Sequence, residues 1–205
     1  MSRPVFYLLA GPNGAGKSTL YSAAVREGLI PAGAPFVNAD LYAAANLQHV
    51  ADPLERSQQA RTWADAQRAL CLRDGQTFAS ETVFSHPSKL VLIDQARAAG
   101  FDVALLVVCV DDPKLLLDRV AGRVLEGGHA VPPERVLARY PRTLGNLALA
   151  VRRADLALLY DTTAVPRSAV APHRLVARCR KGELRWRADR LPAWANTLLA
   201  THSAP

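Results

Sequence analysis

The sequence predicts an α/β fold in which a parallel sheet carries helices on both faces and a C-terminal β-hairpin is added at one edge. Apolar runs of strand length alternate along the chain with longer helical patterns, which is typical of parallel strands joined by crossover helices. The run 103–110 is apolar throughout, as expected of a central strand that is buried on both faces. By contrast, the segment 174–187 predicts two short strands that meet at Lys181-Gly182.

The expected elements follow this alternation, with short apolar runs as strands and longer mixed segments as helices. Strands are expected at 5–10, 36–38, 77–81, 103–110 and 156–160, and hairpin strands at 174–180 and 183–187. Helices are expected at 19–26, 54–73, 87–99, 114–125 and 133–150, with a short helix after Pro192. A chain of 205 residues that is 50% hydrophobic can bury one core. We therefore expect a single domain over 1–205, with 114–133 as a candidate lid and 174–205 as an edge hairpin and terminal helix.

The most specific motif is Gly11-Pro12-Asn13-Gly14-Ala15-Gly16-Lys17-Ser18, which fits the phosphate-binding pattern G-x-x-x-x-G-K-[ST] at every fixed position. A strand-like run precedes it and a helical segment that starts at Thr19 follows, which is the context that a P-loop requires. The glycines let backbone N–H groups surround phosphates, and the helix N-terminus adds its positive end. Lys17 would reach the β/γ-phosphates and Ser18 would ligate Mg²⁺. The motif therefore predicts a P-loop NTPase fold that binds ATP through residues 11–19, against the alternative of a chance glycine-rich turn.

Polar side chains follow two of the predicted strands where ligands bind in parallel α/β sheets, beyond the carboxyl ends. Asp40 follows the strand 36–38, Glu81 ends the strand 77–81, and Thr82 comes directly after it. A carboxylate beside the γ-phosphate can accept a proton from an acceptor hydroxyl, which predicts a kinase with Asp40 as its base. Glu81 and Thr82 are expected to hold the acceptor or to orient Mg²⁺.

Each of these carboxylates also has a structural interpretation. Asp40 could be the N-cap of a helix that starts at Leu41, and Glu81 could pair with a buried arginine. Asp111, at the end of the central strand, could be a Walker-B-type magnesium ligand or could cap the helix after Pro113. For Asp111 we favour the cap.

The segment 118–129 predicts a lid. Arg119 and Arg123 are four residues apart, so they share one helical face. The glycine pair 127–128 then interrupts the helix, as in the lids of small-molecule kinases. The two arginines would neutralise charge on the transferring phosphoryl group, or they are ordinary solvated helix charges. His129 could contact the acceptor or a phosphate, cap a helix or fill the turn.

The net charge of +7 comes mostly from arginine, whose planar fork suits phosphates. Aromatic residues are scarce and no basic strand with interleaved aromatics appears, so nucleic acid is not the favoured partner. Compositional drift toward arginine is the alternative. For Arg139, Arg142 and Asn146, farther along the chain, ligand contact and surface packing are equally open interpretations.

The three cysteines, Cys71, Cys109 and Cys179, are isolated and lack C-x-x-C spacing. They predict reduced thiols, a cytoplasmic chain and no zinc site. The chain opens directly into a short strand and contains no apolar stretch long enough to span a bilayer. We therefore expect no signal peptide and no membrane segment.

Several motifs occur together in one order along 5–163. They are the phosphate loop, Phe36-Val37-Asn38-Ala39-Asp40, Phe78-Ala79-Ser80-Glu81-Thr82, and Arg123 through Gly127-Gly128-His129-Ala130-Val131-Pro132 with Arg139-Tyr140. This combination resembles the short, stand-alone branch of the zeta toxin family. The larger zeta toxins have a second lid arginine where this chain offers His129, and their long sugar-nucleotide-binding insertions are missing here.

The resemblance implies a P-loop kinase that uses ATP to phosphorylate the 3′-hydroxyl of the aminosugar in UDP-N-acetylglucosamine, with an antitoxin protein as partner. By that analogy Asp40 is the catalytic base, and Lys17 with Ser18 holds ATP and Mg²⁺. Glu81 and Thr82 would contact the sugar nucleotide, and one lid arginine would stabilise the transferring phosphate. The alternatives are a kinase of another small molecule, such as a nucleoside, dinucleotide or antibiotic, and a nucleotide-dependent binding protein or ATPase switch.

Overall fold

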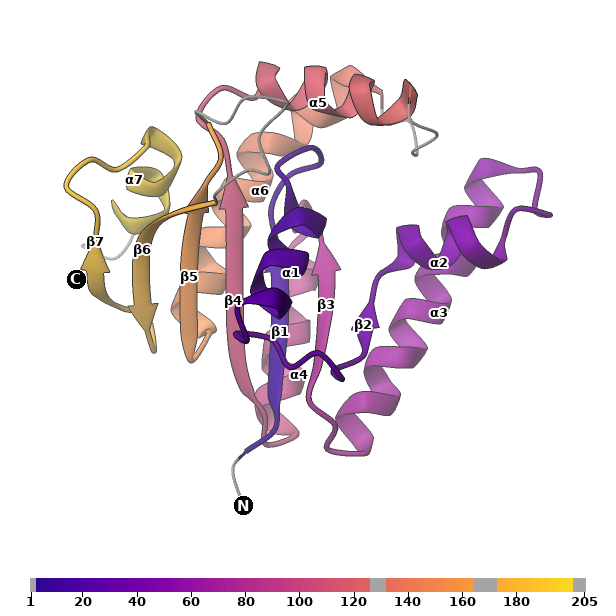
Figure 1. Cartoon of the computed structure of the whole chain (residues 1–205), viewed down its shortest axis with the longest axis horizontal. Helices are drawn as coiled ribbons and strands as arrows, with labels where there is room; N and C mark the ends of the chain where they lie inside the picture. Colours follow the sequence, from indigo (N-terminus) through magenta and orange to yellow (C-terminus); the bar gives the residue numbers. More distant parts are fainter. Residues whose placement is uncertain (1–2, 126–131, 164–172, 201–205) are drawn as a thin grey trace.

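A computed structural model of the chain describes residues 3–125, 132–163 and 173–200, with the side chains of 123–125 left out. Its centre is a seven-stranded sheet in the order β2-β3-β1-β4-β5-β6-β7 (Figure 1). The strands are β1 (Val5–Ala10), β2 (Phe36–Val37), β3 (Phe78–Thr82), β4 (Asp102–Cys109), β5 (Leu156–Asp161), β6 (Arg174–Arg180) and β7 (Glu183–Arg187). The first five pair in parallel, whereas β6 and β7 pair antiparallel. The predicted fold class, with its C-terminal hairpin, is confirmed.

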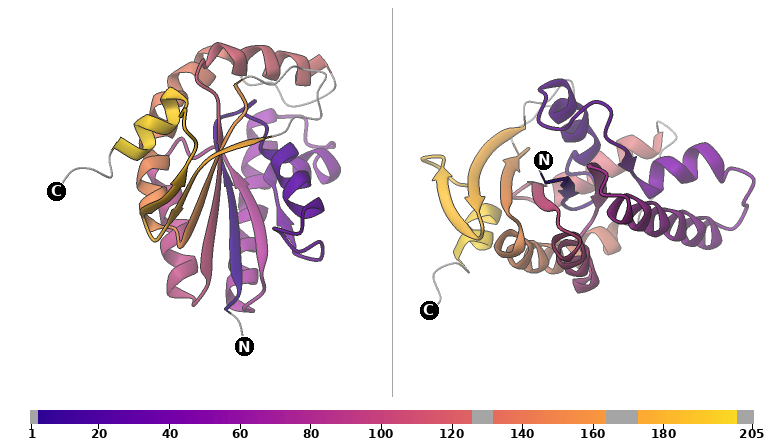
Figure 2. Two further views of the ribbon diagram at one scale, coloured as in Figure 1. Left: turned by 60° about the vertical axis from the view of Figure 1, so that its left-hand side comes forward. Right: turned by 90° about the horizontal axis from the view of Figure 1, so that it is seen from below.

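Helices cover both faces of the sheet (Figures 1 and 2). They are α1 (Lys17–Arg26), α2 (Ala39–Asn46), α3 (Pro53–Arg73), α4 (Leu90–Ala98), α5 (Lys114–Leu125), α6 (Pro133–Arg153) and α7 (Ala193–Ala200), with a 3₁₀ turn η1 (Pro87–Lys89) before α4. Helix α1 lies on one face and α4 and α6 lie on the other. Helix α5 crosses above the edge at which the parallel strands end (Figure 1).

Strand β4 is the central strand of the core. Strands β1 and β5 pair with its two edges, and helices cover both its faces (Figure 2). Every residue of β4 after Asp102 is buried, as expected of a continuous apolar run. Phe6 of β1 and Phe78 of β3 stack with their ring centroids 4.4 Å apart. The predicted central strand is therefore confirmed, and its apolar side chains fix the position of the edge above it.

The register of β1 and β3 determines what surrounds the phosphate loop. Leu9 of β1 lies opposite Glu81 of β3, and Ala10 lies opposite Thr82. Gly11 follows Ala10 directly, so the pairing of β1 with β3 places Glu81 beside the start of the phosphate loop. The tight turn that brings α3 back into β3 begins at Asp74 and includes Gly75, whose φ of 61° suits glycine.

All three cysteines are free and buried. Burial raises the pKa of each thiol, to about 12 for Cys109 and about 11 for Cys179. These side chains are therefore protonated packing groups at neutral pH. Over the part of the chain that the structure describes, no helix has the length and apolar character needed to cross a membrane.

Candidate active site

The phosphate loop has a backbone path that only glycine allows at two points. A Cβ atom on Gly11 would lie 2.0 Å from the carbonyl oxygen of Val108 in β4, so the loop leaves β1 in direct contact with the neighbouring strand. Gly16 has a φ of 98° and is the N-cap of α1. Both positions require a residue without a side chain. The fixed glycines of the motif thus have a steric cause in this fold.

The N-terminus of α1 lacks a side-chain cap, and its first turn contains no acidic residue. Its first backbone N–H groups therefore need an external acceptor, and the helix dipole favours an anion there. Lys17 adds a full positive charge: its side chain is 5% exposed, and Nζ donates to the carbonyl oxygen of Pro12 at 3.0 Å. These features together form a phosphate-binding site.

Glu81 connects the phosphate loop to the rest of the site. Its Oε1 lies 3.6 Å from Nζ of Lys17, and its Oε2 accepts hydrogen bonds from Ser18 Oγ at 3.1 Å and Asn38 Nδ2 at 3.0 Å. The alternative that Glu81 pairs with a buried arginine is wrong, because its cationic partner is Lys17. The buried Arg68 pairs instead with Asp65.

The donor set beside the loop fits Mg²⁺. A hydroxyl and a carboxylate oxygen already lie 3.1 Å apart at Ser18 and Glu81. Magnesium binds through one or two protein oxygens and completes its octahedron with phosphate oxygens and waters. Ser18 and Glu81 are thus the residues that would hold the ion between the protein and a nucleotide. Thr82 lies beyond them, and its hydroxyl accepts a hydrogen bond from the backbone N–H of Phe84 at 3.4 Å.

A first prediction concerns this metal contact. Replacing Glu81 with glutamine removes the charge but keeps the side-chain shape. We expect the Mg²⁺ concentration for half-maximal transfer to rise about tenfold or more, as for other lost metal contacts. A Mg²⁺ titration at saturating ATP measures it, with Glu183→Gln on the exposed strand β7 as the matched control. An unchanged Mg²⁺ requirement would assign Glu81 to the acceptor instead.

The alternative that Asp40 caps a helix starting at Leu41 is also wrong. Helix α2 begins at Ala39, and its N-cap is Asn38, whose Oδ1 accepts the backbone N–H groups of Asp40 at 2.9 Å and Leu41 at 3.1 Å. Asp40 lies in the first turn with an exposed side chain. Its carboxylate is not used as a cap, because Asn38 fills that position.

Asn38 is a site residue that our sequence interpretation missed. Its side chain is buried and makes two kinds of contact: Nδ2 donates a hydrogen bond to Glu81, and Oδ1 caps α2. It therefore fixes the turn that carries Asp40 relative to the phosphate loop. The available signal was an asparagine directly before a helical segment, a strongly preferred N-cap residue.

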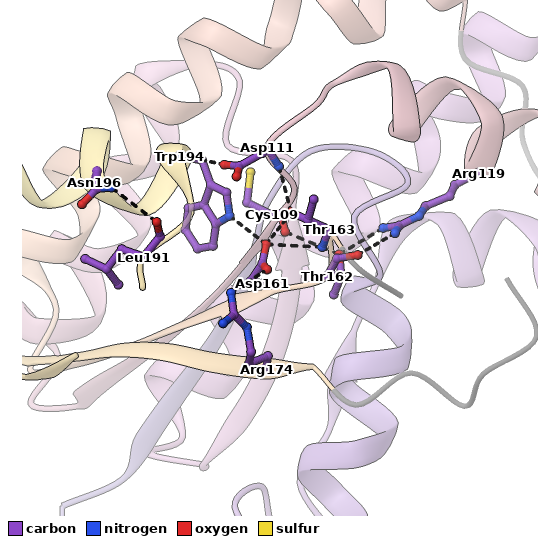
Figure 3. A network of polar contacts seen from close by, with 10 residues as sticks. All are labelled: Cys109, Asp111, Arg119, Asp161, Thr162, Thr163, Arg174, Leu191, Trp194 and Asn196. Atoms are coloured by element: carbon purple, nitrogen blue, oxygen red, sulfur yellow. Dashed lines mark hydrogen bonds and ion pairs between the residues drawn. The ribbon is translucent and has the colours of Figure 1, made fainter. Parts of the chain in front are cut away.

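Arg119 links α5 to the phosphate loop (Figure 3). Its guanidinium donates to Thr162 Oγ1 at 3.0 Å and to the Thr162 carbonyl at 2.6 Å, and Thr162 Oγ1 in turn contacts the carbonyl of Ala15 at 3.1 Å. Burial lowers the pKa of Arg119, which the negative charge of Asp161 partly opposes. Arg123 follows one turn later in α5, but its side chain lies outside the described residues, as does all of His129.

The expectation that Asp111 caps the helix after Pro113 is wrong. Asp111 Oδ1 accepts the backbone N–H of Trp194 at 3.0 Å, at the start of α7, and Asp112 Oδ1 accepts the N–H of Lys114 at 2.8 Å. The buried carboxylate of Asp161 accepts hydrogen bonds from Trp194 Nε1 at 3.1 Å and from Arg174 at 3.2 Å (Figure 3). Asp111 therefore attaches α7 to the end of β4, and Asp161 attaches it to the end of β5.

His173 is a second contact that the sequence interpretation missed. Its Nε2 lies 3.0 Å from the carbonyl oxygen of Gly16, which can only accept, so Nε2 carries the proton. Nδ1 is then an acceptor, and it is buried with no partner among the described residues. Burial lowers the pKa of His173, which favours this neutral form. His173 and Gly16 are 157 positions apart in the sequence, so no local signal predicts the contact.

These features define a P-loop protein with the fold of the small-molecule kinases. Residues 7–147 match the family described as AAA domain, and because this match spans more than half of the chain, the chain belongs to that family. No curated protein matches the chain.

Solved structures share the fold at low sequence identity. The AvrRxo1-ORF1:-ORF2 complex with ATP is 18% identical with a TM-score of 0.67 and covers 89% of this chain and 60% of that one. The PezAT chromosomal toxin–antitoxin system of Streptococcus pneumoniae is 15% identical with a TM-score of 0.58 and covers 78% and 68%. A putative kinase from Chloroflexus aurantiacus is 17% identical with a TM-score of 0.57 and covers 82% and 94%. The likeness to zeta-toxin-like P-loop kinases is confirmed at the level of the fold, although the chain spans only 60% of the AvrRxo1 chain.

Proposed function

We propose that this protein is an ATP-dependent small-molecule kinase of zeta toxin type, which transfers the γ-phosphate to a hydroxyl of a sugar nucleotide, UDP-N-acetylglucosamine. One observation carries the proposal. The Glu81 carboxylate contacts Lys17 and Ser18 of the phosphate loop and is joined through Asn38 to the turn that holds Asp40. A nucleotide site and a candidate base for an acceptor hydroxyl are thereby held in one network.

In this proposal each side chain has a separate role. Lys17 and the N-terminus of α1 hold the β- and γ-phosphates, where positive charge stabilises the transition state. Ser18 and Glu81 hold Mg²⁺, which neutralises phosphate charge when it is bound. Asp40 accepts the proton of the attacking hydroxyl. Because Asn38 and not Asp40 caps α2, the Asp40 carboxylate keeps its lone pairs for that task.

The comparisons support parts of this proposal. The AvrRxo1-ORF1:-ORF2 structure is a complex with ATP, and PezAT is a toxin–antitoxin system. By that analogy we propose ATP as the phosphate donor and an antitoxin protein as a partner of this chain. The three free thiols are in keeping with a cytoplasmic location.

The deciding experiment incubates the purified protein with ATP, Mg²⁺ and a panel of acceptors. The panel contains UDP-N-acetylglucosamine, other sugar nucleotides, dinucleotides, nucleosides and an aminoglycoside, and mass spectrometry looks for a product one phosphate heavier. We expect UDP-N-acetylglucosamine to be phosphorylated. If ADP and inorganic phosphate form at the same rate with every acceptor and with none, the protein is an ATPase switch.

A second prediction concerns the lid arginines. An arginine that acts only as charge develops lowers kcat and kcat/KM together and leaves KM for ATP nearly constant. We expect Arg119→Ala or Arg123→Ala to behave in this way. Steady-state kinetics of both variants measure it. An increase of KM for ATP with kcat intact would identify ground-state nucleotide contacts, and two unchanged constants would show that neither arginine acts on the reaction.

A further inference from the structure

Basic side chains from three separate elements gather beyond the carboxyl end of β3. We call them the basic cluster. Its members are Arg61 of α3, Lys89 of η1, and Arg135, Arg139 and Arg142 of α6. None of them belongs to the phosphate loop, and the proposed function assigns no role to any of them.

Helix α3 places Arg61 at the level of the segment after β3. The side chain of Arg68 donates to Ser80 Oγ at 3.1 Å, which fixes α3 against β3 at that point. Arg61 lies seven residues before Arg68, which is about 10 Å along the helix and on the same face. Strand β3 runs the opposite way (Figure 1) and advances about 10 Å from Ser80 to Val83. The backbone of Arg61 therefore lies about as far along the direction of β3 as that of Val83.

Helix α6 brings Arg139 to the same segment from another direction. Thr143 Oγ1 donates to the carbonyl of Val83 at 3.4 Å, and Asn146 Nδ2 donates to the carbonyl of Phe84 at 3.0 Å. Arg139 precedes Thr143 by four residues, so it lies on the same face, about 6 Å farther toward the helix N-terminus. Arg61 of α3 and Arg139 of α6 therefore approach the segment after Glu81 from two sides, near enough for the charge of Arg61 to act on Arg139.

The positive charges of the basic cluster lie close enough to lower one another's pKa. Burial, Arg135, Arg142 and Arg61 all lower the pKa of Arg139. Burial, Arg68 and Arg61 likewise lower the pKa of Lys89, although Asp65 opposes them. Among the described residues, Asp65 is paired with Arg68, and no carboxylate lies within ion-pair distance of Arg61, Lys89 or Arg139. Positive charge therefore accumulates at this edge, and Asp65 opposes it only in part.

We infer that the basic cluster binds a phosphate or diphosphate group of the acceptor, with Arg61 and Arg139 as its main contacts. Arginine forks recognise phosphate oxygens in a bidentate manner and retain their charge near other cations. The identity of this anion as part of the acceptor rests on the proposed function, whereas the anion site itself does not. The acceptor is then a phosphorylated metabolite, and neutral sugars, nucleosides and aminoglycosides are poor substrates.

The first test measures binding without catalysis. The phosphate loop is saturated with Mg²⁺ and a non-hydrolysable ATP analogue at physiological salt, and UDP, pyrophosphate and uridine are titrated by calorimetry. We expect UDP and pyrophosphate to bind and uridine to bind at least about tenfold more weakly, because charge-assisted hydrogen bonds dominate. Arg61→Gln and Arg139→Gln should each weaken UDP binding about tenfold, whereas Arg187→Gln, on the exposed strand β7, should leave it unchanged.

Thermal unfolding of each variant checks that it folds. Uridine binding as tight as that of UDP would overturn the inference, as would equal losses in Arg187→Gln and in the two cluster variants. The absence of UDP binding to the wild-type protein would do the same.

The second test uses the kinase reaction. With a phosphorylated acceptor, Arg139→Gln should raise KM for the acceptor about tenfold and leave KM for ATP unchanged, because it removes a ground-state contact. Equal rates with UDP-N-acetylglucosamine and free N-acetylglucosamine would overturn the inference while supporting the kinase. If the wild-type protein phosphorylates no acceptor but binds UDP as expected, the result supports the anion site and contradicts the proposed function.

Discussion

Replacing Lys17 with alanine is expected to lower phosphoryl transfer by at least about 10³-fold, because a fixed positive charge beside the transferring phosphate is lost. The structure shows where this charge is held. The Nζ atom lies inside the loop, 3.0 Å from the Pro12 carbonyl and 3.6 Å from the Glu81 carboxylate. Without Lys17, Glu81 would face the phosphates with its negative charge uncompensated. The loss therefore combines a missing attraction with an added repulsion.

The measurement for Lys17 is the rate of product formation together with ATP affinity. Lys17→Met keeps most of the apolar stem and separates the lost charge from lost packing. Lys181→Asn is the matched control, because it removes a lysine in the β6–β7 turn, where the φ of 50° suits asparagine. Wild-type transfer by the Lys17→Ala variant would contradict the kinase proposal as a whole.

Asp40→Asn is expected to lower transfer by about 10²-fold or more with little change in ATP affinity, since it removes a general base and leaves the nucleotide site intact. The structure makes this substitution interpretable. Asn38 provides the cap of α2, and the Asp40 side chain is exposed in its first turn. An asparagine at position 40 should therefore leave the fold unchanged.

Two assays are needed for Asp40: equilibrium binding of an ATP analogue and single-turnover transfer to the acceptor. Glu55→Gln is the control, because Glu55 is also an acidic residue in the first turn of a helix, α3, and its loss reports any general effect of the helix dipole. If transfer in Asp40→Asn equals that of the wild-type protein, Asp40 is a surface charge. The acceptor side of the proposal would then lose its base.

The sequence by itself determined the strands, most of the helices and the phosphate loop. Strand β1 and helix α5 begin and end where the apolar pattern predicts. The hairpin lies at the edge of the sheet, as the turn at Lys181-Gly182 indicates. These features depend on neighbouring residues, because periodicity, turn chemistry and positive φ angles act over a few positions. Helix α2 was missed because its eight residues are short and contain no buried position that would give a pattern.

Only the tertiary structure decided which side chains meet. Glu81 reaches Lys17 because β3 is the neighbour of β1, and Asp111 reaches Trp194 because α7 packs at the ends of β4 and β5. His173 reaches Gly16 from the far end of the chain. Each contact depends on strand order and helix docking, which are set by burial of the whole core and leave no trace in local sequence. The sequence therefore predicted the phosphate-binding chemistry of the loop, but it did not predict which side chains contact the loop.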